Sequence, residues 1–454
     1  MRVYSNILDM VGRTPMLEIT RLDTGPCRLF LKLEMMNPGG SIKDRIGMAM
    51  IEEAERRGEL TPGDTILEAT SGNTGIALAL VAAQKGYRLV LVIPDKMSPE
   101  KINNLRAMGA EIVLTRSDVN RGHPEYYIDL GERLAKEQGA YLVDQFSNPD
   151  NPLAHEQTTM PEILEQLGGE VDAIVMGAGS SGTIAGICNY LEKHPHEVEV
   201  VLADPVGSIL AAYAETGERG EKTAGWLVEG IGKDFIPSIT NFSKVTKAYT
   251  IGDAEAFNTG RELLRAEGLL AGSSSGALLA AALRYCREQT EPKRVVTFAC
   301  DTGNKYLSKH LNDSWMEDHG FIARERFGDL RDLIGRPYGA NGTVTVGPDD
   351  ILTTAYNRLR IADYSHLPVM DGDRLVGVVS GDAILEHMYD DPGRAQAPVR
   401  DAMEREFETL DSKEPVPELL ARLKTRKYVA IAAGDAFLGL VTRADALSYL
   451  RRQS

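Results

Sequence analysis

Short apolar runs alternate with longer helical patterns through roughly residue 300. The apolar runs are rich in β-branched residues and predict strands at 29–33, 89–93, 111–114, 173–176, 198–202 and 294–298. The segments between them predict helices at 76–85, 99–108, 183–193 and 277–288. This alternation predicts an α/β fold with a parallel sheet covered on both faces by helices. Ligands in such folds bind where loops leave the carboxyl ends of strands, so we expect the chemistry in strand-to-helix loops.

An internal repeat follows in the C-terminal part of the chain. The segment Gly372-Asp-Arg-Leu-Val-Gly-Val-Val-Ser380 aligns with Gly434-Asp-Ala-Phe-Leu-Gly-Leu-Val-Thr442 at an offset of 62 residues, and a helical run follows each copy. Two short αβ units of similar sequence predict a tandem, pseudo-symmetric module. The expected organisation is a first domain over 1–325, a polar linker over 326–337, and a tandem module over 338–454, with repeats at about 338–395 and 398–454.

Composition narrows the possible partners. The chain has 66 acidic and 50 basic side chains, a formal net charge of −16, which disfavours binding to nucleic acid or to an anionic membrane. The four cysteines are far apart, which excludes a disulfide framework or a Cys-rich zinc module and fits a reducing, cytoplasmic location. No apolar run reaches about 18 residues, and the eight histidines lack the spacing of a metal site, so no membrane span and no metal are expected.

The first candidate loop is Asn37-Pro-Gly-Gly-Ser-Ile-Lys-Asp-Arg45. Its proline and glycines predict a sharp turn, with Ser41 as a helix N-cap and Asp44 in the first turn. A capped helix start with a surface lysine would explain this pattern. Alternatively, Lys43 lies desolvated near the positive end of the helix, where its amine has a lowered pKa and serves as a Schiff-base nucleophile.

Three further loops rich in Gly, Ser and Thr precede helices. Residues 68–75 form either a capped turn or a pocket of N–H and hydroxyl groups for a carboxylate. Residues 177–182 match GxGxxG, with Asp204 about twenty residues further on, and this leaves open a dinucleotide site of an NAD-dependent oxidoreductase or a cradle for a single phosphate. Residues 269–276 carry serines that either cap the next helix or meet a buried ring nitrogen.

One lysine, one carboxylate pocket, one phosphate cradle and one isolated hydroxyl together describe a pyridoxal-phosphate site. The segments 40–45, 70–75 and 179–183 resemble the fold-type-II pyridoxal-phosphate enzymes over about residues 5–315. The oxidoreductase alternative explains only one of these loops. The segments 144–155 and 228–237 are most similar to the cystathionine β-synthases of that family, and the C-terminal repeat resembles a pair of CBS domains, or Bateman module. The resemblance implies a two-lobed catalytic core with parallel or mixed sheets flanked by helices.

The resemblance also implies a role for each matching residue. Lys43 would hold pyridoxal 5′-phosphate as a Schiff base and then act as the base at Cα of the substrate, Asn73 would bond the phenolic oxygen of the cofactor, and Ser274 would face its pyridine nitrogen. The phosphate would be bound by Gly179, Ser180, Ser181, Gly182 and Thr183. The substrate would be bound by Thr70, Ser71, Thr74, Gln145 and Gly232.

The implied activity is that of a carbon–oxygen lyase (hydro-lyase) that works by β-replacement. L-Serine would condense with L-homocysteine to give L-cystathionine, a step of transsulfuration and cysteine biosynthesis. The alternative is a cysteine synthase that uses O-acetyl-L-serine and sulfide. It stays open because Phe146 stands where the cystathionine β-synthases often have tyrosine.

Further expectations concern haem, regulation and assembly. The similarity starts within the first ten residues, so no N-terminal haem-binding region and no haem are expected. Ribose-binding CBS domains usually carry a hydroxyl residue three positions before an aspartate. Thr442 and Asp445 keep that spacing, whereas Ser380 and Asp382 are one residue short, so an adenosyl ligand such as S-adenosylmethionine or a nucleotide is expected at the second repeat. A homo-oligomer, dimer or tetramer, is also expected.

Overall fold

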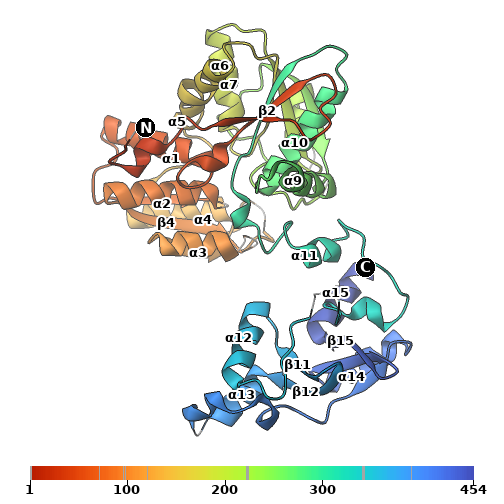
Figure 1. Ribbon diagram of the computed structural model, residues 1–454. Helices are drawn as coiled ribbons and strands as arrows, with labels where there is room; N and C mark the ends of the chain where they lie inside the picture. The colour runs from red at the N-terminus through yellow and green to blue at the C-terminus, as the bar shows by residue number, and fades with distance from the viewer. Residues whose placement is uncertain are drawn as a thin grey trace. The chain divides into compact units, whose positions relative to one another are not determined.

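The structure is a computed structural model that describes residues 3–70, 72–95, 97, 99–119, 121–220, 224–339, 343–389 and 391–453. The chain divides into two compact units, Met1–Asp313 and Ser314–Ser454 (Figure 1).

The first unit contains two sheets, and six of their ten described strands were predicted. In the larger sheet the strand order is β1-β2-β10-β7-β8-β9, and all pairs are parallel except β1–β2. Its strands are β1 (Met16–Ile19), β2 (Arg28–Lys32), β7 (Ala173–Gly177), β8 (Glu199–Pro205), β9 (Val245–Ile251) and β10 (Arg294–Phe298). The smaller sheet is wholly parallel, in the order β5-β4-β3-β6. Its strands are β3 (Thr65–Ala69), β4 (Arg88–Pro94), β5 (Glu111–Thr115) and β6 (Tyr141–Leu142).

Helices connect these strands, as the alternating pattern predicted. Those of the first unit are α1 (Lys43–Arg57), α2 (Asn73–Lys85), α3 (Pro99–Ala107), α4 (Tyr127–Gln138), α5 (Asp150–Ala154), α6 (Met160–Gln166), α7 (Gly182–Lys193), α8 (Leu210–Thr216), α9 (Asp253–Glu267) and α10 (Ser273–Arg287). A π-helical turn, His155–Thr159, joins α5 to α6. The predicted α/β fold of parallel and mixed sheets with flanking helices is confirmed.

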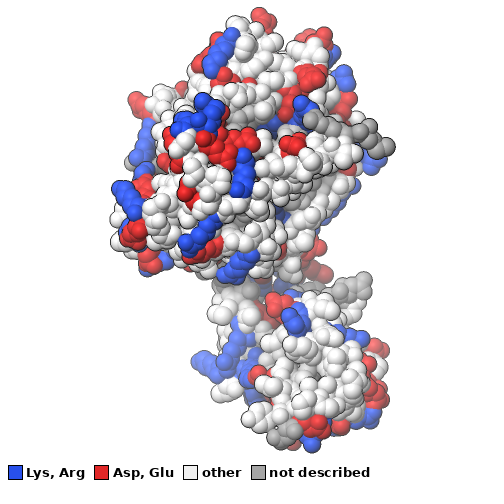
Figure 2. Space-filling model, turned by 90° about the vertical axis from the view of Figure 1, so that its left-hand side faces the viewer, with Lys and Arg blue, Asp and Glu red and all other residues white. Residues whose placement is uncertain are grey.

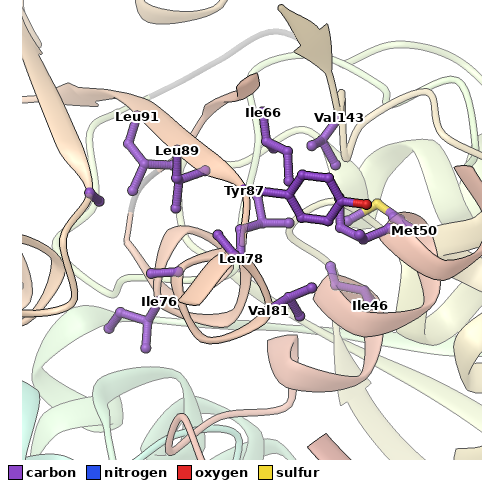
Figure 3. Close-up of a cluster of buried hydrophobic side chains, with 14 of the residues drawn as sticks. Ile46, Met50, Ile66, Ile76, Leu78, Val81, Tyr87, Leu89, Leu91 and Val143 are labelled. Atoms are coloured by element: carbon purple, nitrogen blue, oxygen red, sulfur yellow. The ribbon is translucent and has the colours of Figure 1, made fainter. Parts of the chain in front are cut away.

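Both faces of the smaller sheet are buried, which explains why β4 is almost continuously apolar. On one face Ile66 and Leu89 pack against Met50 of α1 and Leu78 of α2 (Figure 3). On the other face Leu67, Val90 and Val92 pack against Ile128 and Ala135 of α4. Successive side chains of a strand point to opposite faces, so a strand covered on both sides needs apolar residues at nearly every position.

The second unit contains two similar halves. The first half pairs β11 (His366–Asp371) with β12 (Arg374–Ser380), and the second contains β13 (Thr409–Asp411), β14 (Tyr428–Ala433) and β15 (Ala436–Thr442). Its helices are α12 (Leu352–Ala362), α13 (Gly381–Met388), α14 (Val416–Thr425) and α15 (Arg443–Gln453), and α11 (Asp313–Asp318) spans the unit boundary. The β11–β12 register shifts after Val369 and the β14–β15 register after Ile431, positions that are equivalent in the repeat. The predicted tandem repeat therefore forms two copies of one structural unit.

Residues within the segment expected to link the domains belong to the core of the second unit. A 3₁₀ turn, Leu330–Leu333, buries Leu330 and Leu333, and the next residue, Ile334, is also buried. These side chains pack against Leu419 and Val441 of the second repeat. This part of the segment is therefore packed rather than solvent-exposed.

Two observations, one on the helices and one on the surface charge, bear on the expected partners. Within the part of the chain that the structure describes, no helix has the length and apolar character needed to cross a membrane. On the face shown in Figure 2, basic and acidic side chains are interspersed.

Candidate active site

A cavity of about 430 Å³ opens in the first unit where strands of both sheets end. The loops that follow β6 and β7 and the starts of α1 and α2 all contribute to its wall. The predicted site residues that line it are Lys43, Asn73, Thr74, Gln145, Gly179, Ser180 and Gly232. This location agrees with the rule that parallel α/β folds bind ligands at the carboxyl ends of their strands.

Lys43 is the first residue of α1, and its side chain reaches the cavity. Burial lowers the pKa of its amine, and the nearby charge of Asp301 opposes this shift only in part. The helix N-cap is Ile42 rather than the predicted Ser41, whose Oγ instead accepts from the Lys43 backbone N–H at 3.3 Å. Ser41 forms a β-bridge with Asp301, so the turn is anchored to the chain that follows β10. The environment favours a neutral, nucleophilic amine.

A buried ionic network anchors the first turn of α1. Arg45 bonds both oxygens of Glu34, at 2.8 Å each, and also pairs with Glu162 at 2.7 Å. Burial alone would raise the pKa values of both glutamates, but Arg45 lowers that of Glu34 and brings that of Glu162 down to about 2. Lys32 completes the network with a bond to Glu162 at 2.8 Å. Because removing one partner leaves an uncompensated buried charge, the network holds this turn firmly.

Asn73, the first residue of α2, has both ends of its amide occupied. Its Nδ2 donates to Asp301 Oδ2 at 2.8 Å, and its Oδ1 accepts from Lys305 Nζ at 3.0 Å. Asp301 Oδ2 also accepts from the hydroxyl of Tyr306 at 2.6 Å. These bonds fix the orientation of the amide, because a carboxylate oxygen only accepts and an ammonium only donates. One N–H of Asn73 is left for a ligand.

The predicted carboxylate pocket lies beside Asn73. Thr70 is buried, and its Oγ1 accepts from the Gly72 N–H at 3.2 Å. Thr74 donates to Gln145 Oε1 at 2.8 Å, which joins the first turn of α2 to the loop after β6. Ser71, also predicted here, lies outside the described residues.

The predicted phosphate loop forms a tight turn at the start of α7. A Cβ on Gly179 would lie 2.2 Å from the carbonyl oxygen of Gly230, and one on Gly182 would lie 1.7 Å from Asn151 Oδ1, so neither position admits a side chain. Ser181 adopts a left-handed conformation with φ of 70°. Its Oγ is buried and has no hydrogen-bond partner. A buried hydroxyl without a partner at the amino end of a helix suits an anion such as phosphate.

Asp204 argues against the dinucleotide alternative. It is fully buried, and its Oδ2 accepts from the Ala211 N–H in the first turns of α8 at 2.9 Å. Burial raises the pKa of this carboxyl to about 6. Because this carboxylate is fully buried and bonds its own backbone, a bound ribose could not reach it.

Thr183 and Ser274 are two further residues predicted to bind the cofactor. Thr183 Oγ1 lies 3.2 Å from His155 Nε2, and His155 Nδ1 lies 2.9 Å from Thr159 Oγ1. Burial lowers the pKa of His155 far below its usual value, so this imidazole is neutral. Ser274 is buried at the start of α10, and a Cβ on Gly230 would lie 3.7 Å from Ser274 Oγ.

Sequence reasoning missed the partners that hold the site residues. Asp301 and Lys305 follow strand β10, and Glu68 and Asn151 lie in or near predicted motifs, but none of the four was predicted as a site residue. The rule that ligand sites gather at strand ends could have drawn attention to Asp301, three residues after Phe298. No sequence pattern pairs Glu68 with Gln145, 77 positions away.

In the second unit the two predicted motifs differ in geometry. Asp445 Oδ2 accepts from the Thr442 backbone N–H at 2.8 Å and from the Thr442 hydroxyl at 2.6 Å. Ser380 instead caps α13 by accepting from the Ala383 N–H, and Asp382 is exposed and pairs with Lys427 at 2.6 Å. Only the second motif brings its hydroxyl and its carboxylate together.

Comparison with known proteins finds a matching family for each of the two parts of the chain. The pyridoxal-phosphate dependent enzyme family matches residues 7–301, and the CBS domain family matches residues 332–390 and 399–452. The cystathionine beta-synthase of Mus musculus is 44% identical over 328 residues, 71% of this chain but only 58% of that relative. The cystathionine beta-synthase of Dictyostelium discoideum is 34% identical over 466 residues, 99% of this chain and 93% of that relative.

Among solved structures, an O-acetylserine dependent cystathionine beta-synthase from Helicobacter pylori is 39% identical, with a TM-score of 0.62. The match covers 68% of this chain and 99% of that one. The predicted resemblance to this family, followed by two CBS repeats, is therefore confirmed.

Proposed function

The chain belongs to the pyridoxal-phosphate dependent enzyme family, and we propose that it catalyses a β-replacement that joins L-serine to L-homocysteine and releases water, giving L-cystathionine. Relatives named cystathionine beta-synthase support this reaction, among them one aligned over nearly the whole chain. The observation that carries the proposal is one cavity lined by the Lys43 amine, the Asn73 and Gln145 amides and the phosphate loop.

The site fits pyridoxal phosphate. The unpartnered Ser181 hydroxyl and the amino end of α7 suit the phosphate, with Gly179, Ser180, Gly182 and Thr183. Lys43 would hold the cofactor covalently, the remaining N–H of Asn73 would reach its phenolic oxygen, and Ser274 would reach its ring nitrogen. When bound, the cofactor supplies an electron sink that stabilises negative charge at Cα of an amino acid, so that a group at Cβ can leave.

The chain's own residues would handle binding and proton transfer. Thr70, Ser71, Thr74 and Gln145 would hold the substrate carboxylate. The desolvated Lys43 amine would remove the α-proton, for which a lowered pKa is an advantage near neutral pH. A hydroxyl is a poor leaving group and must depart with a proton, which the same amine, once protonated, would provide.

A cysteine synthase reaction, from O-acetyl-L-serine and sulfide, is the second candidate. The solved Helicobacter pylori enzyme is described as O-acetylserine dependent, and Phe146 lines the cavity here.

The proposal extends to the second unit and to the assembly. The CBS repeats would bind an adenosyl ligand at Thr442 and Asp445 and regulate the first unit. We further propose a cytoplasmic homo-oligomer without haem.

A substrate panel tests the proposed reaction. The purified protein is expected to be yellow, and Lys43→Ala is expected to lose both the cofactor absorbance and turnover, by a factor of about 10³ or more. L-Serine and O-acetyl-L-serine, each combined with homocysteine or sulfide and analysed by mass, identify the preferred pair. A protein that binds no pyridoxal phosphate would contradict the proposal, and cysteine as the main product would favour the second candidate.

A further inference from the structure

Glu68 is a buried carboxyl group directly behind the wall of the cavity. It lies on β3, only 1% of its surface is exposed, and it does not line the cavity itself. Its Oε1 accepts from Gln145 Nε2 at 2.8 Å, while its Oε2 is buried without a hydrogen-bond partner. Burial raises the pKa of Glu68 to about 8, against the opposing effect of Gln145. Burying such a group is costly, and the proposed reaction does not use it directly.

The segment that carries Gln145 is held in an uncommon conformation. Asp144 has a positive φ of 46°, which is rare for residues other than glycine. The backbone carbonyl of Asp144 accepts from the N–H groups of Ser147 and Asn148, at 3.0 and 2.9 Å. The carbonyl of Gln145 accepts from Asn151 Nδ2 at 2.7 Å, and this amide also donates to Ser180 Oγ at 3.1 Å. The backbone of Gln145 is therefore tied to the phosphate loop.

The Gln145 side chain is held from two sides. Its Oε1 accepts from the Thr74 hydroxyl at 2.8 Å, and its Nε2 donates to Glu68 at 2.8 Å. An amide nitrogen carries two hydrogens, so one N–H remains for the cavity that Gln145 lines. Without an acceptor at position 68, the amide could rotate and present its oxygen to the cavity, where it would repel a carboxylate.

We infer that Glu68 is a positioning residue for amino-acid substrates: it fixes the Gln145 amide so that the remaining N–H donates to the substrate α-carboxylate. This inference rests on the proposed function, because it assumes that an amino acid occupies the cavity. It applies equally to L-serine and to O-acetyl-L-serine, which share that carboxylate.

Binding of L-alanine to the cofactor-loaded full chain tests the inference. L-Alanine shares the α-amino and α-carboxylate groups but has no leaving group, and calorimetry reads its binding directly. Glu68→Leu, which removes the acceptor, is expected to raise the Kd about tenfold, whereas Glu68→Gln, which keeps an acceptor oxygen, stays near the wild-type value. Glu68→Ala replaces the leucine variant if that variant does not fold.

Asp204→Ala is the matched control. Asp204 is another buried carboxyl with one unpartnered oxygen, and it does not line the cavity. Its removal is expected to lower stability while leaving the Kd for L-alanine within about twofold. A rise in Kd equal to that of Glu68→Leu would overturn the inference, because a general loss of stability would then explain both.

A double-mutant cycle separates action through Gln145 from any other effect. In a Gln145→Ala background, Glu68→Leu is expected to change the Kd by less than about twofold, because the group that it positions is already gone. A full tenfold effect in that background, or none in the wild-type background, would overturn the inference. If the wild-type protein holds pyridoxal phosphate but binds no L-alanine, or binds no cofactor, the proposed function fails instead.

Discussion

The two units bury polar groups very differently. The first unit buries charged side chains, among them Glu34, Arg45, Glu68 and Asp301, whereas Ser412 is the one buried polar side chain among the described residues of the second unit. Buried charges are tolerated only when they are paired or functionally needed. The first unit therefore loses some stability by holding reactive groups in its interior. The second unit has apolar cores and keeps its polar motifs nearer the surface.

Breaking the buried ionic network should have the largest effect on stability. Glu34→Gln removes the charge that Arg45 meets at 2.8 Å, with both side chains almost fully buried. We expect a loss of about 3–5 kcal/mol in the free energy of unfolding, measured by chemical denaturation. The exposed pair Arg28–Glu18, also at 2.8 Å, is the matched control, and Glu18→Gln should cost less than about 1 kcal/mol. Equal losses in the two variants would contradict this account.

Acid should weaken the same network over a defined range of pH. The pKa of Glu162 falls from 4.5 to about 2 on folding, so its contribution is present above the unfolded value and is lost as the pH drops through about 5 to 2. Above pH 5 the free energy of unfolding of the wild type should exceed that of Glu162→Gln by about 3 kcal/mol. The measurement is urea unfolding of both proteins at several pH values. A difference that does not change between pH 6 and pH 3 would show that the carboxylate charge is not responsible.

Six strands of the first unit and the main loops could be predicted because they depend on local patterns, whereas β3, which carries Glu68, was not predicted. The apolar run of β4 reflects burial on both faces, and the repeat around Gly377 and Gly439 reflects a structural unit used twice. The partners of the site residues could not be predicted. Asp301 meets Asn73 across 228 positions, and only the folded sheets bring them within 2.8 Å. No sequence pattern marks a single acidic residue in or after a strand as part of a site.

In the second unit, the carboxylate of Asp445 should control ligand binding without affecting the first unit's chemistry. Asp445→Ala removes the acceptor that holds Thr442, and we expect the affinity for an adenosyl ligand to fall about tenfold or more. Calorimetry of the full chain with AMP, ATP and S-adenosylmethionine measures this, and basal turnover should be unchanged. Asp382→Ala, in the exposed motif of the first repeat, is the control and should leave the affinity unaltered. A similar loss in both variants would argue against a site at the second motif.

The smallest expected effect is that of Ser380→Ala, which tests whether the serine of the first repeat caps a helix or binds a ligand. Ser380 Oγ accepts from the Ala383 N–H at 3.2 Å, as the N-cap of α13. Ser380→Ala should therefore lower the stability of the second unit by about 1 kcal/mol, and it should leave the adenosyl affinity unchanged. Thermal unfolding and calorimetry on the same full-length variant give both values. If the affinity falls while the stability holds, the first motif binds ligand after all. The two repeats would then share a function as well as a fold, and the contrast between Ser380 and Thr442 would be one of geometry alone.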